Sequence, residues 1–334
     1  MSNLENNGIV LTSRIRLARN LKNYKFPLKM TGEESNNVVE EVKNAVDRQN
    51  LNYKLTYMRD LSDVEKSVMV EKHLISPALA ERKETGAFLL SHDEKVSIMI
   101  NEEDHIRIQT LGTGMSLKEC WELSNKIDDV LEGEVDYAFD RELGYVTACP
   151  TNIGTGMRAS VMVHLPALSI TNQIEKLLIG ISQLGVAVRG VYGEGTKSMG
   201  HLYQISNQGT LGASEETLID KISQIVAQIV EKEERMRAHL KKNNLYEIED
   251  DCCRAYGLLT NARRMSTEEA MKLLSLLKLG KEMEIIDNAK DKDIYRLMVK
   301  IQPNNILSST DTELTTKERD KMRAEIIRNE LLEN

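Results

Sequence analysis

The chain has 334 residues, long enough to bury a substantial core and to form two domains. Its net charge is −8 because 52 acidic residues outnumber 44 lysines and arginines, so nucleic acid is not the expected partner. The four cysteines form no C-x-x-C pair and no apolar run reaches the roughly 18 residues of a membrane helix, which argues against a zinc knuckle and a bilayer span and favours a soluble, cytoplasmic protein.

Most of the chain alternates between helical and strand-like patterns. Apolar residues at helical spacing predict helices at 33–49, 62–75 and 116–131. Strands are predicted at 86–91, 95–101, 105–111, 135–139, 145–149, 160–166, 186–192 and 201–206, with a further helix at 169–183. Because these elements show no strict βαβ rhythm, we expect an α+β fold in which helices flank an antiparallel sheet.

The character of the sequence changes near residue 214. Residues 214–243 form a long amphipathic pattern, and no strand-like run follows it. Ser266 with Glu269, and Thr315 with Glu318, have the spacing of a helix capping box. We therefore expect a mixed domain over 10–236 and an all-helical domain over 245–334.

Three arginines lie within residues 13–19 (SRIRLAR). In a strand, Arg14 and Arg16 share one face while Ile15 and Leu17 pack inward. Two guanidinium groups on one face suit a polyphosphate, because arginine offers planar, bidentate donors. The simpler alternative is a solvated edge strand whose arginines bind nothing.

Three consecutive carboxylates, Glu102, Glu103 and Asp104, separate two strand-like runs. Because strands alternate their faces, the middle carboxylate is expected to point away from its two neighbours. Such a group suits a bound cation, either a metal ion or a guanidinium group. Arg107 follows it, and the simpler alternative is that Arg107 only neutralises these acids.

Residues 149–160 (CPTNIGTGMRAS) combine a cysteine, two glycines and Arg158. Gly154 and Gly156 permit positive φ and close backbone approach to a ligand, yet no G-K-[ST] follows, so this is not a Walker loop. Cys149 precedes a proline, which favours an extended backbone, and nearby cations would stabilise its thiolate. The alternative for Cys149 is an inert buried thiol.

A second glycine-rich turn is expected at residues 189–196 (RGVYGEGT), with Arg189 at one end and Glu194 inside it. On its own this pattern also describes a tight hairpin with charged surface residues. His73 lies at the end of a predicted helix, where a structural histidine is the simpler interpretation.

Arginines from four separated segments are expected to meet around one ligand: Arg14 with Arg16, Arg107, Arg158 and Arg189. Phosphoryl transfer requires mainly positioning and charge neutralisation, which such a group and Mg²⁺ would provide around ATP. The Mg²⁺ would be held mainly through phosphates and water, with no metal site built from side chains. The chain has neither a V-A-I-K nor an H-R-D signature, which argues against the protein-kinase fold.

In this order, the motifs make the chain resemble the guanidino phosphotransferases, the creatine and arginine kinase family. The resemblance runs through residues 13–16 (SRIR), 101–107 (NEEDHIR), 149–152 (CPTN), 157–160 (MRAS) and 189–194 (RGVYGE). It implies the glutamine-synthetase-like catalytic fold of that family for the domain at 10–236.

Within that family the chain is most similar to the bacterial protein-arginine kinases. The similarity is carried by residues 72–77 (KHLISP), 154–156 (GTG), 191–194 (VYGE) and 319–324 (RDKMRA). The last stretch matches a phosphoarginine-binding motif, R-D-x-x-R-A, on the last predicted helix. Arg319 and Arg323 are one turn apart and suit a phosphate, and Asp320 suits a guanidinium group; the alternative is an ordinary charged helix.

The resemblance implies a role for each matching residue. Glu103 would align the guanidinium group and accept its proton, Glu194 would be a second ligand of that group, and Cys149 would lie beside it. The residues implied in ATP binding are Ser13, Arg14, Ile15, Arg16, Leu17, His73, Arg107, Arg158, Ala159, Ser160, Val161, Met162, Arg189, Gly190, Val191, Tyr192, Gly193 and Glu194. Those implied in allosteric phosphoarginine binding are Arg319, Asp320, Arg323 and Ala324.

The chain departs from the small-molecule kinases of the family in two places. Its first motif begins at residue 13, so we expect no helical domain before the sheet, and an open site suits an arginine on a protein surface. Residues 195–197 read GTK where a further acid is usual, so that acid's role passes to Glu194.

The implied activity is transfer of the ATP γ-phosphoryl group to exposed arginines of protein substrates. Phosphorylation of free arginine, or binding of phosphoarginine proteins without catalysis, are the alternatives. The resemblance also implies a stress-response role, an McsA-type activator, a Clp protease that receives the marked proteins, and assembly into a homodimer or higher homo-oligomer.

Overall fold

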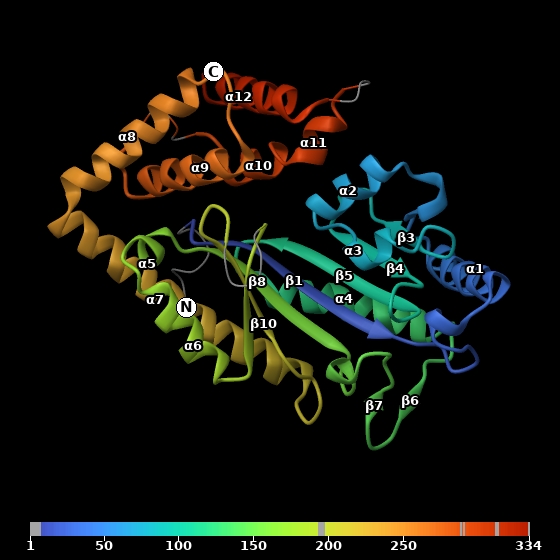
Figure 1. The fold of residues 1–334 in the computed structure, drawn as a ribbon. Coiled ribbons are helices and arrows are strands. Elements are labelled where there is room, and N and C mark those ends of the chain that lie inside the picture. The colour runs from blue at the N-terminus through green and yellow to red at the C-terminus, as the bar shows by residue number, and fades with distance from the viewer. Residues whose placement is uncertain (1–7, 193–197, 288, 290, 311–313, 333–334) are drawn as a thin grey trace.

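The computed structural model describes residues 8–192, 198–287, 289, 291–310 and 314–332. Within these residues the expected α+β fold is confirmed, because one antiparallel sheet has the strand order β2-β3-β4-β5-β1-β8-β10-β9 (Figure 1). Its strands are β1 (Val10–Arg19), β2 (Lys54–Tyr57), β3 (Ala87–Leu90), β4 (Val96–Ile100), β5 (Ile106–Thr113), β8 (Met157–His164), β9 (Val186–Gly190) and β10 (Leu202–Asn207).

Helices flank the sheet and then form a region of their own. Those of the sheet region are α1 (Gly32–Arg48), α2 (Asp63–Glu71), α3 (Pro77–Ala80), α4 (Leu117–Glu132), α5 (Pro166–Ile170), α6 (Ile174–Ser182) and α7 (Glu215–Asn243). The helical region that follows holds α8 (Leu245–Asn261), α9 (Thr267–Glu282), α10 (Ile294–Lys300), α11 (Pro303–Leu307) and α12 (Thr316–Leu332). In the described part of the chain, none of these helices has the length and apolar content needed to cross a membrane.

Strand β1 lies in the middle of the sheet, between β5 and β8, so the alternative of a solvated edge strand is wrong. Ile15 and Leu17 are fully buried in the main core, which α1, α4, α6 and α7 complete on that face. Arg14 and Arg16 alternate with them and are partly exposed on the opposite face. The sheet therefore has an apolar face covered by helices and a polar face that carries arginines.

The strands expected at 135–139 and 145–149 are largely wrong. They shrink to a two-residue pair, β6 (Phe139–Asp140) and β7 (Gly144–Tyr145), outside the main sheet. The amide of Ala138 instead donates to the carbonyl of Asn20 at 2.7 Å, just beyond β1. Apolar side chains such as Tyr137 pack on the core from an irregular segment, which periodicity alone does not distinguish from a strand.

The helix expected at 169–183 is divided into α5 and α6. Asn172 adopts a φ of 55°, a left-handed conformation that ends a helix. The Thr171 hydroxyl also donates to the carbonyl of Ala167 at 2.7 Å, so it occupies an acceptor of the last turn. The backbone conformation of Asn172 and the hydroxyl bond of Thr171 therefore end the helix, although the apolar spacing predicts that it continues.

The helical region packs over one end of the polar face of the sheet (Figure 1). Its core includes Leu11, Met162 and Leu202 from the sheet region. Long helix α7 contributes Ile222 to the main core and Leu240 to the helical core, so it joins both. The helical region therefore borders the polar face of the sheet, which carries the arginines.

Candidate active site

Three neighbouring strands place Arg14, Arg16, Arg107 and Arg158 on the polar face, and we call these four residues the arginine cluster. The register pairs Arg16 of β1 with Arg158 of β8, and Arg107 lies on β5, on the other side of β1. Arg189 is exposed on edge strand β9 and is close enough to Arg158 to repel it electrostatically. The four separated segments therefore lie together.

Two of the four cluster arginines, Arg14 and Arg158, are held by neutral partners. Arg14 Nη2 donates to Gln204 Oε1 at 2.9 Å, and Arg158 Nη2 donates to Ser206 Oγ at 2.9 Å. Among the described residues, no ion pair involves Arg14, Arg16 or Arg158. The hydroxyl and amide groups fix these guanidinium groups in place without cancelling their charge.

Burial and mutual repulsion make this arrangement unfavourable without an anion. Burial, followed by repulsion from Arg158 and Arg107, lowers the pKa of Arg14 to about 10. Burial also lowers the pKa of Arg16 well below its ordinary value, and its Nε is buried with no hydrogen-bond partner among the described residues. A polyanion would supply the missing partner and offset the repulsion, so these residues fit a triphosphate.

The acidic triplet forms a bend between β4 and β5 rather than part of a strand, yet its middle carboxylate does differ from its neighbours, since Glu102 and Asp104 are buried and Glu103 is not. Glu102 is buried, and its carboxylate accepts from Arg107 Nη1 at 2.6 Å and from Ser76 Oγ at 2.7 Å. Asp104 is also buried and accepts from the side chain of Asn20 and from the amide of residue 148, both at 2.7 Å. Both carboxylates are therefore committed to structure.

Glu103 is the carboxylate of the triplet that remains available. Its side chain is 44% exposed, and its Oε2 lies 3.4 Å from Arg107 Nη2. Arg107 does neutralise acids of the triplet, as the simpler alternative held, but it also lies within the arginine cluster. The result is one open carboxylate at the border of a cationic site, an arrangement suited to align a guanidinium group against a phosphate.

His73 follows α2 with a φ of 60°, and its ring lies 5.7 Å from that of Tyr192 between centroids. The Tyr192 hydroxyl is 3.3 Å from His73 Nε2. Burial, followed by repulsion from Arg14 and Arg16, lowers the pKa of His73 to about 4. His73 is therefore neutral at physiological pH and contributes shape and hydrogen bonding to the site rather than charge.

Cys149 is half-buried rather than fully buried, so the alternative of an inert interior thiol is wrong for its position. Its Sγ lies 3.0 Å from Thr151 Oγ1. It is also close enough to Arg158 for the two side chains to interact electrostatically. The thiol therefore borders the arginine cluster.

Gly154 and Gly156 serve the fold in a way that the sequence did not indicate. A Cβ on Gly156, which has a φ of 63°, would come within 2.6 Å of the Ala18 carbonyl oxygen. A Cβ on Gly154 would come within 2.7 Å of the Thr210 carbonyl oxygen. The close backbone approach that these glycines permit is to the protein's own chain.

Several residues implied in ATP binding do not turn their side chains to the polar face. The side chains of Ile15, Leu17, Ala159 and Val161 lie in the main core because strand residues alternate between faces. Ser13 Oγ donates to the carbonyl of residue 114 at 2.7 Å and accepts from the amide of residue 116 at 3.0 Å. The expectation is therefore corrected for these five positions. Their side chains have structural roles and do not face a ligand on the polar face.

The remaining implied residues fall into three groups: two near Arg14, two at the end of β9 and two outside the described residues. Ser160 Oγ accepts from Arg14 Nε at 3.3 Å, and Met162 lines a cavity beside Arg14. Gly190 ends β9, and Val191 is buried in the helical core. Gly193 and Glu194 lie outside the described residues.

The residues of the phosphoarginine motif differ in how far they are exposed to solvent. Arg323 is 1% exposed, and its guanidinium group donates to the carbonyls of Ile301 and Met265 at 3.0 and 2.9 Å and to Asp320 Oδ1 at 2.7 Å. Arg319 is partly exposed, and Ala324 is buried in the helical core. The expected pair of arginines on one open face is therefore wrong for Arg323, because its side chain is buried and its Nε and Nη1 bond to backbone carbonyls and Asp320.

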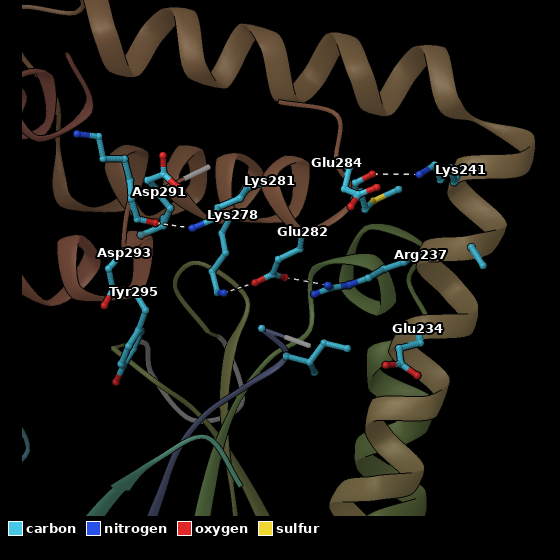
Figure 2. A pocket seen from close by; sticks show the side chains of 16 residues that line it. Glu234, Arg237, Lys241, Lys278, Lys281, Glu282, Glu284, Asp291, Asp293 and Tyr295 are labelled. Atoms are coloured by element: carbon cyan, nitrogen blue, oxygen red, sulfur yellow. Dashed lines mark hydrogen bonds and ion pairs between the residues drawn. The ribbon is translucent and has the colours of Figure 1, made fainter. Parts of the chain in front are cut away.

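A larger cavity of about 720 Å³ lies between α7 and the end of α9, beside the helical region (Figure 2). Some of its charges are paired, because Arg237 Nη1 lies 2.8 Å from Glu282 Oε2 and Lys278 also bonds to Glu282. Lys241 and Lys281 donate to backbone carbonyls instead. In the described part of the chain, no group of three or more His, Cys, Asp or Glu residues could hold a metal ion. Acidic and basic residues are mixed in this lining, unlike the arginine cluster, where cations gather on one face.

Four residues of the site region, Glu71, Tyr295, Asn304 and Asn305, were not indicated by the sequence. Glu71 accepts hydrogen bonds from the backbone and side-chain amides of Asn304 and Asn305, at 2.7 to 3.0 Å. Tyr295 donates to Met162 Sδ at 3.2 Å. Such contacts join segments far apart in the chain, and only the tertiary structure brings them together.

The two parts of the chain match two family models. Residues 35–236 match the ATP:guanido phosphotransferase, C-terminal catalytic domain, and residues 245–334 match the protein-arginine kinase McsB C-terminal domain. Among solved structures, the crystal structure of lombricine kinase has a TM-score of 0.62 at 23% identity, over 72% of this chain and 70% of that chain. That likeness concerns the fold.

Curated relatives match over nearly the whole chain. The protein-arginine kinase of Clostridium tetani (strain Massachusetts / E88) is 44% identical over 99% of this chain and 97% of its own length. The protein-arginine kinase of Moorella thermoacetica (strain ATCC 39073 / JCM 9320) is 48% identical over 96% of this chain and 93% of its own length.

Proposed function

The chain belongs to the protein-arginine kinases of the ATP:guanido phosphotransferase family, and we propose from this that it transfers the γ-phosphoryl group of ATP to arginine side chains of proteins. The observation that carries the proposal is the open carboxylate of Glu103 beside a cluster of arginines that mostly lack acidic partners. The carboxylate suits a guanidinium substrate and the cluster suits a triphosphate.

An arginine guanidinium group is a poor nucleophile because its lone pairs are delocalised and its pKa exceeds about 12. We propose that Glu103 aligns one guanidino nitrogen with the γ-phosphorus and accepts a proton from that nitrogen. The N–P bond forms as the bond from the γ-phosphorus to the bridging oxygen breaks, and ADP leaves. The arginine cluster would hold the nucleotide phosphates and stabilise the charge that develops on the transferred group.

We propose the following further ligands and neighbours of the reacting groups. Mg²⁺, when bound with ATP, would neutralise part of the phosphate charge, and its ligands would be phosphate oxygens and water. Cys149 would lie beside the guanidinium group, which makes activity sensitive to oxidation of this half-buried thiol. We assign Glu194 as a second guanidinium ligand.

We also propose that residues 10–236 form a catalytic domain and that residues 245–334 form a regulatory domain. Phosphoarginine would bind beside Arg319 and Asp320, and Arg323 would orient the Asp320 carboxylate through their 2.7 Å contact. Occupation of this site would promote self-assembly and activity. The proposal extends to an McsA-type activator, a Clp protease that receives the marked proteins, and a stress-response role in the cytoplasm, where the four free cysteines would stay reduced.

The decisive experiment compares Glu103→Gln with the wild type. Each is incubated with MgATP and a folded protein that has exposed arginines, and phosphoarginine is quantified by mass spectrometry under conditions that preserve the N–P bond. Loss of the proton acceptor is expected to slow transfer by roughly 10²- to 10⁴-fold. Glu249→Gln, at an exposed position of α8, is the matched control and is expected to keep full activity.

Two results would contradict the proposal. Unchanged transfer by Glu103→Gln would remove the catalytic assignment. Phosphorylation of free arginine, with the protein substrate left unmodified, would identify a small-molecule kinase instead.

A further inference from the structure

A cavity of about 340 Å³ lies between the polar face of the sheet and helix α10 of the helical region. The sheet contributes Arg14, Ser160 and Met162 to its lining, and the segment after α2 contributes His73. Tyr295 and Val299 of α10 line it from the helical region, and further residues before β4 and at the end of β5 complete the lining. The helical region therefore forms part of a cavity whose inner wall includes the arginine cluster.

Tyr295 is directed into this space. Its hydroxyl donates to Met162 Sδ at 3.2 Å and interacts electrostatically with Arg14. Tyr295 also borders the larger cavity at the end of α9, and its ring points from α10 towards the strands (Figure 2). Burial raises the pKa of Tyr295 to about 12, so the phenol stays protonated and can donate at neutral pH.

The lining combines charged and apolar groups. Its cations are Arg14, Lys72 and Lys95 and its acid is Asp93, while Met162, Val299 and the Tyr295 ring provide apolar surface. A nucleoside triphosphate also combines charged phosphates with a flat aromatic base. The cavity is also at the lower end of the usual volume of small-molecule sites, about 300 to 1,000 Å³.

A second contact joins the end of α2 to α11, the helix that follows α10. Glu71, the last residue of α2, accepts four hydrogen bonds from Asn304 and Asn305 at the start of α11. The carbonyl of Glu71 lies 3.4 Å from the Tyr192 hydroxyl, which in turn lies 3.3 Å from His73 Nε2. One end of α2 therefore contacts both the helical region and the lining of the cavity.

We propose that helix α10 completes the nucleotide site, with Tyr295 and Val299 packing against the nucleoside of bound ATP. The inference rests on the proposed function, because it takes ATP as the ligand of the arginine cluster. It adds that the affinity for nucleotide depends on the helical region being docked on the sheet. Glu71 acts as a positioning residue through its bonds to α11.

The test measures equilibrium binding of ADP and ATP to the full chain by titration calorimetry, with no phosphoryl acceptor present. Tyr295→Ala is expected to weaken nucleotide binding by roughly tenfold or more, because a base–aromatic contact is lost. Tyr295→Phe keeps the ring and is expected to bind within about threefold of the wild type. Tyr246→Ala removes an 83% exposed tyrosine of α8 and is expected to bind as the wild type does.

Two further variants protect the test against misfolding of Tyr295→Ala. Val299→Trp fills the cavity from the partly exposed side of α10 and is expected to abolish nucleotide binding. Glu71→Gln weakens the contact with α11 and is expected to weaken binding while Arg14 and Arg16 are unchanged. Circular dichroism and thermal melting establish that each variant is folded.

The possible results separate this inference from the proposed function. Nucleotide affinity that is unchanged in folded Tyr295→Ala and Val299→Trp overturns the role of α10, even if protein-arginine transfer proceeds. If the wild type binds nucleotide in a Tyr295-dependent way but modifies no arginine, α10 keeps its role and the proposed function fails.

Discussion

Three adjacent carboxylates of similar chemistry acquire different roles from their surroundings. Asp104 bonds to Asn20 and a backbone amide, Glu102 bonds to Arg107 and Ser76, and Glu103 retains an exposed face. Residue type and spacing pointed to the group, and the family resemblance pointed to Glu103. The hydrogen bonds that commit its two neighbours could not be read from the sequence, because their partners lie on other segments.

Glu102 is expected to act as a positioning residue for the reaction. In Glu102→Gln, Arg107 loses its close anionic partner, so Glu103 would be drawn to Arg107 and away from a guanidinium substrate. We expect kcat to fall by roughly tenfold or more, a typical cost of a small displacement of a catalytic group, while KM for ATP changes less. Steady-state kinetics with a protein substrate measure this split.

Ser76→Ala is the matched control for Glu102. It removes the hydroxyl that donates to Glu102 and accepts from the Leu79 amide, but it leaves the carboxylate charge in place. We expect lower stability, by about 1 kcal/mol, with little change in kcat. An equal loss of kcat in both variants would show that the charge of Glu102 is not what holds Arg107.

At the scale of elements, β1 joins the site to the core through its alternating residues. The sequence predicted this alternation because side chains at successive strand positions face opposite sides. The sequence did not show where Arg19, the third arginine of the motif, would point. Its side chain turns away from the cluster and towards α4. Arg19 Nη2 lies 2.6 Å from Asp128 Oδ2, and its guanidinium carbon lies 3.5 Å from the centre of the Tyr145 ring.

The Arg19–Asp128 pair is expected to be essential for the stability of this junction. Both side chains are at most 6% exposed, so Asp128→Asn leaves a buried cation without its counter-charge. The free energy of unfolding is expected to fall by about 3 to 5 kcal/mol. Urea denaturation followed by circular dichroism measures the change.

The Arg48–Glu134 pair provides the comparison for that measurement. The Arg48 side chain is 66% exposed, so Glu134→Gln is expected to cost no more than about 1 kcal/mol. If both variants lose the same stability, burial does not determine the contribution of these ion pairs.

At the scale of the whole molecule, the sheet and the helical region meet through contacts that the sequence could not predict. The change of pattern near residue 214 indicated where the strands end, and the tail motif indicated a separate role. Neither indicated that Ser275 of α9 would lie between two histidines of the sheet region. Its Oγ is 2.8 Å from His164 Nε2 and 2.8 Å from His201 Nδ1.

This shared hydroxyl makes the junction sensitive to acid. Burial lowers the pKa of His164 well below its ordinary value, with Lys278, Arg237 and His201 adding repulsion. Burial, with a contribution from Lys272, lowers the pKa of His201 to about 4. Both imidazoles are therefore neutral in the folded protein at pH 7.

The sign of the pH effect follows from the protons bound in each state. In the unfolded chain a histidine takes up a proton below about pH 6.5, whereas His201 in the folded protein does so only near pH 4. The unfolded state therefore binds more protons between these values, and stability falls as the pH is lowered from 6.5 to 4. His201 contributes at most about 3 kcal/mol to this loss.

The prediction is tested by the difference between two pH profiles, because carboxylates contribute to acid unfolding in both proteins. The free energy of unfolding of the wild type and of His201→Gln is measured by urea denaturation from pH 7.5 to 4.5. Glutamine can still bond to Ser275 but does not titrate, so the variant is expected to lose less stability below pH 6.5. Parallel profiles would mean that His201 is protonated equally in the folded and unfolded states and does not make this contact sensitive to acid.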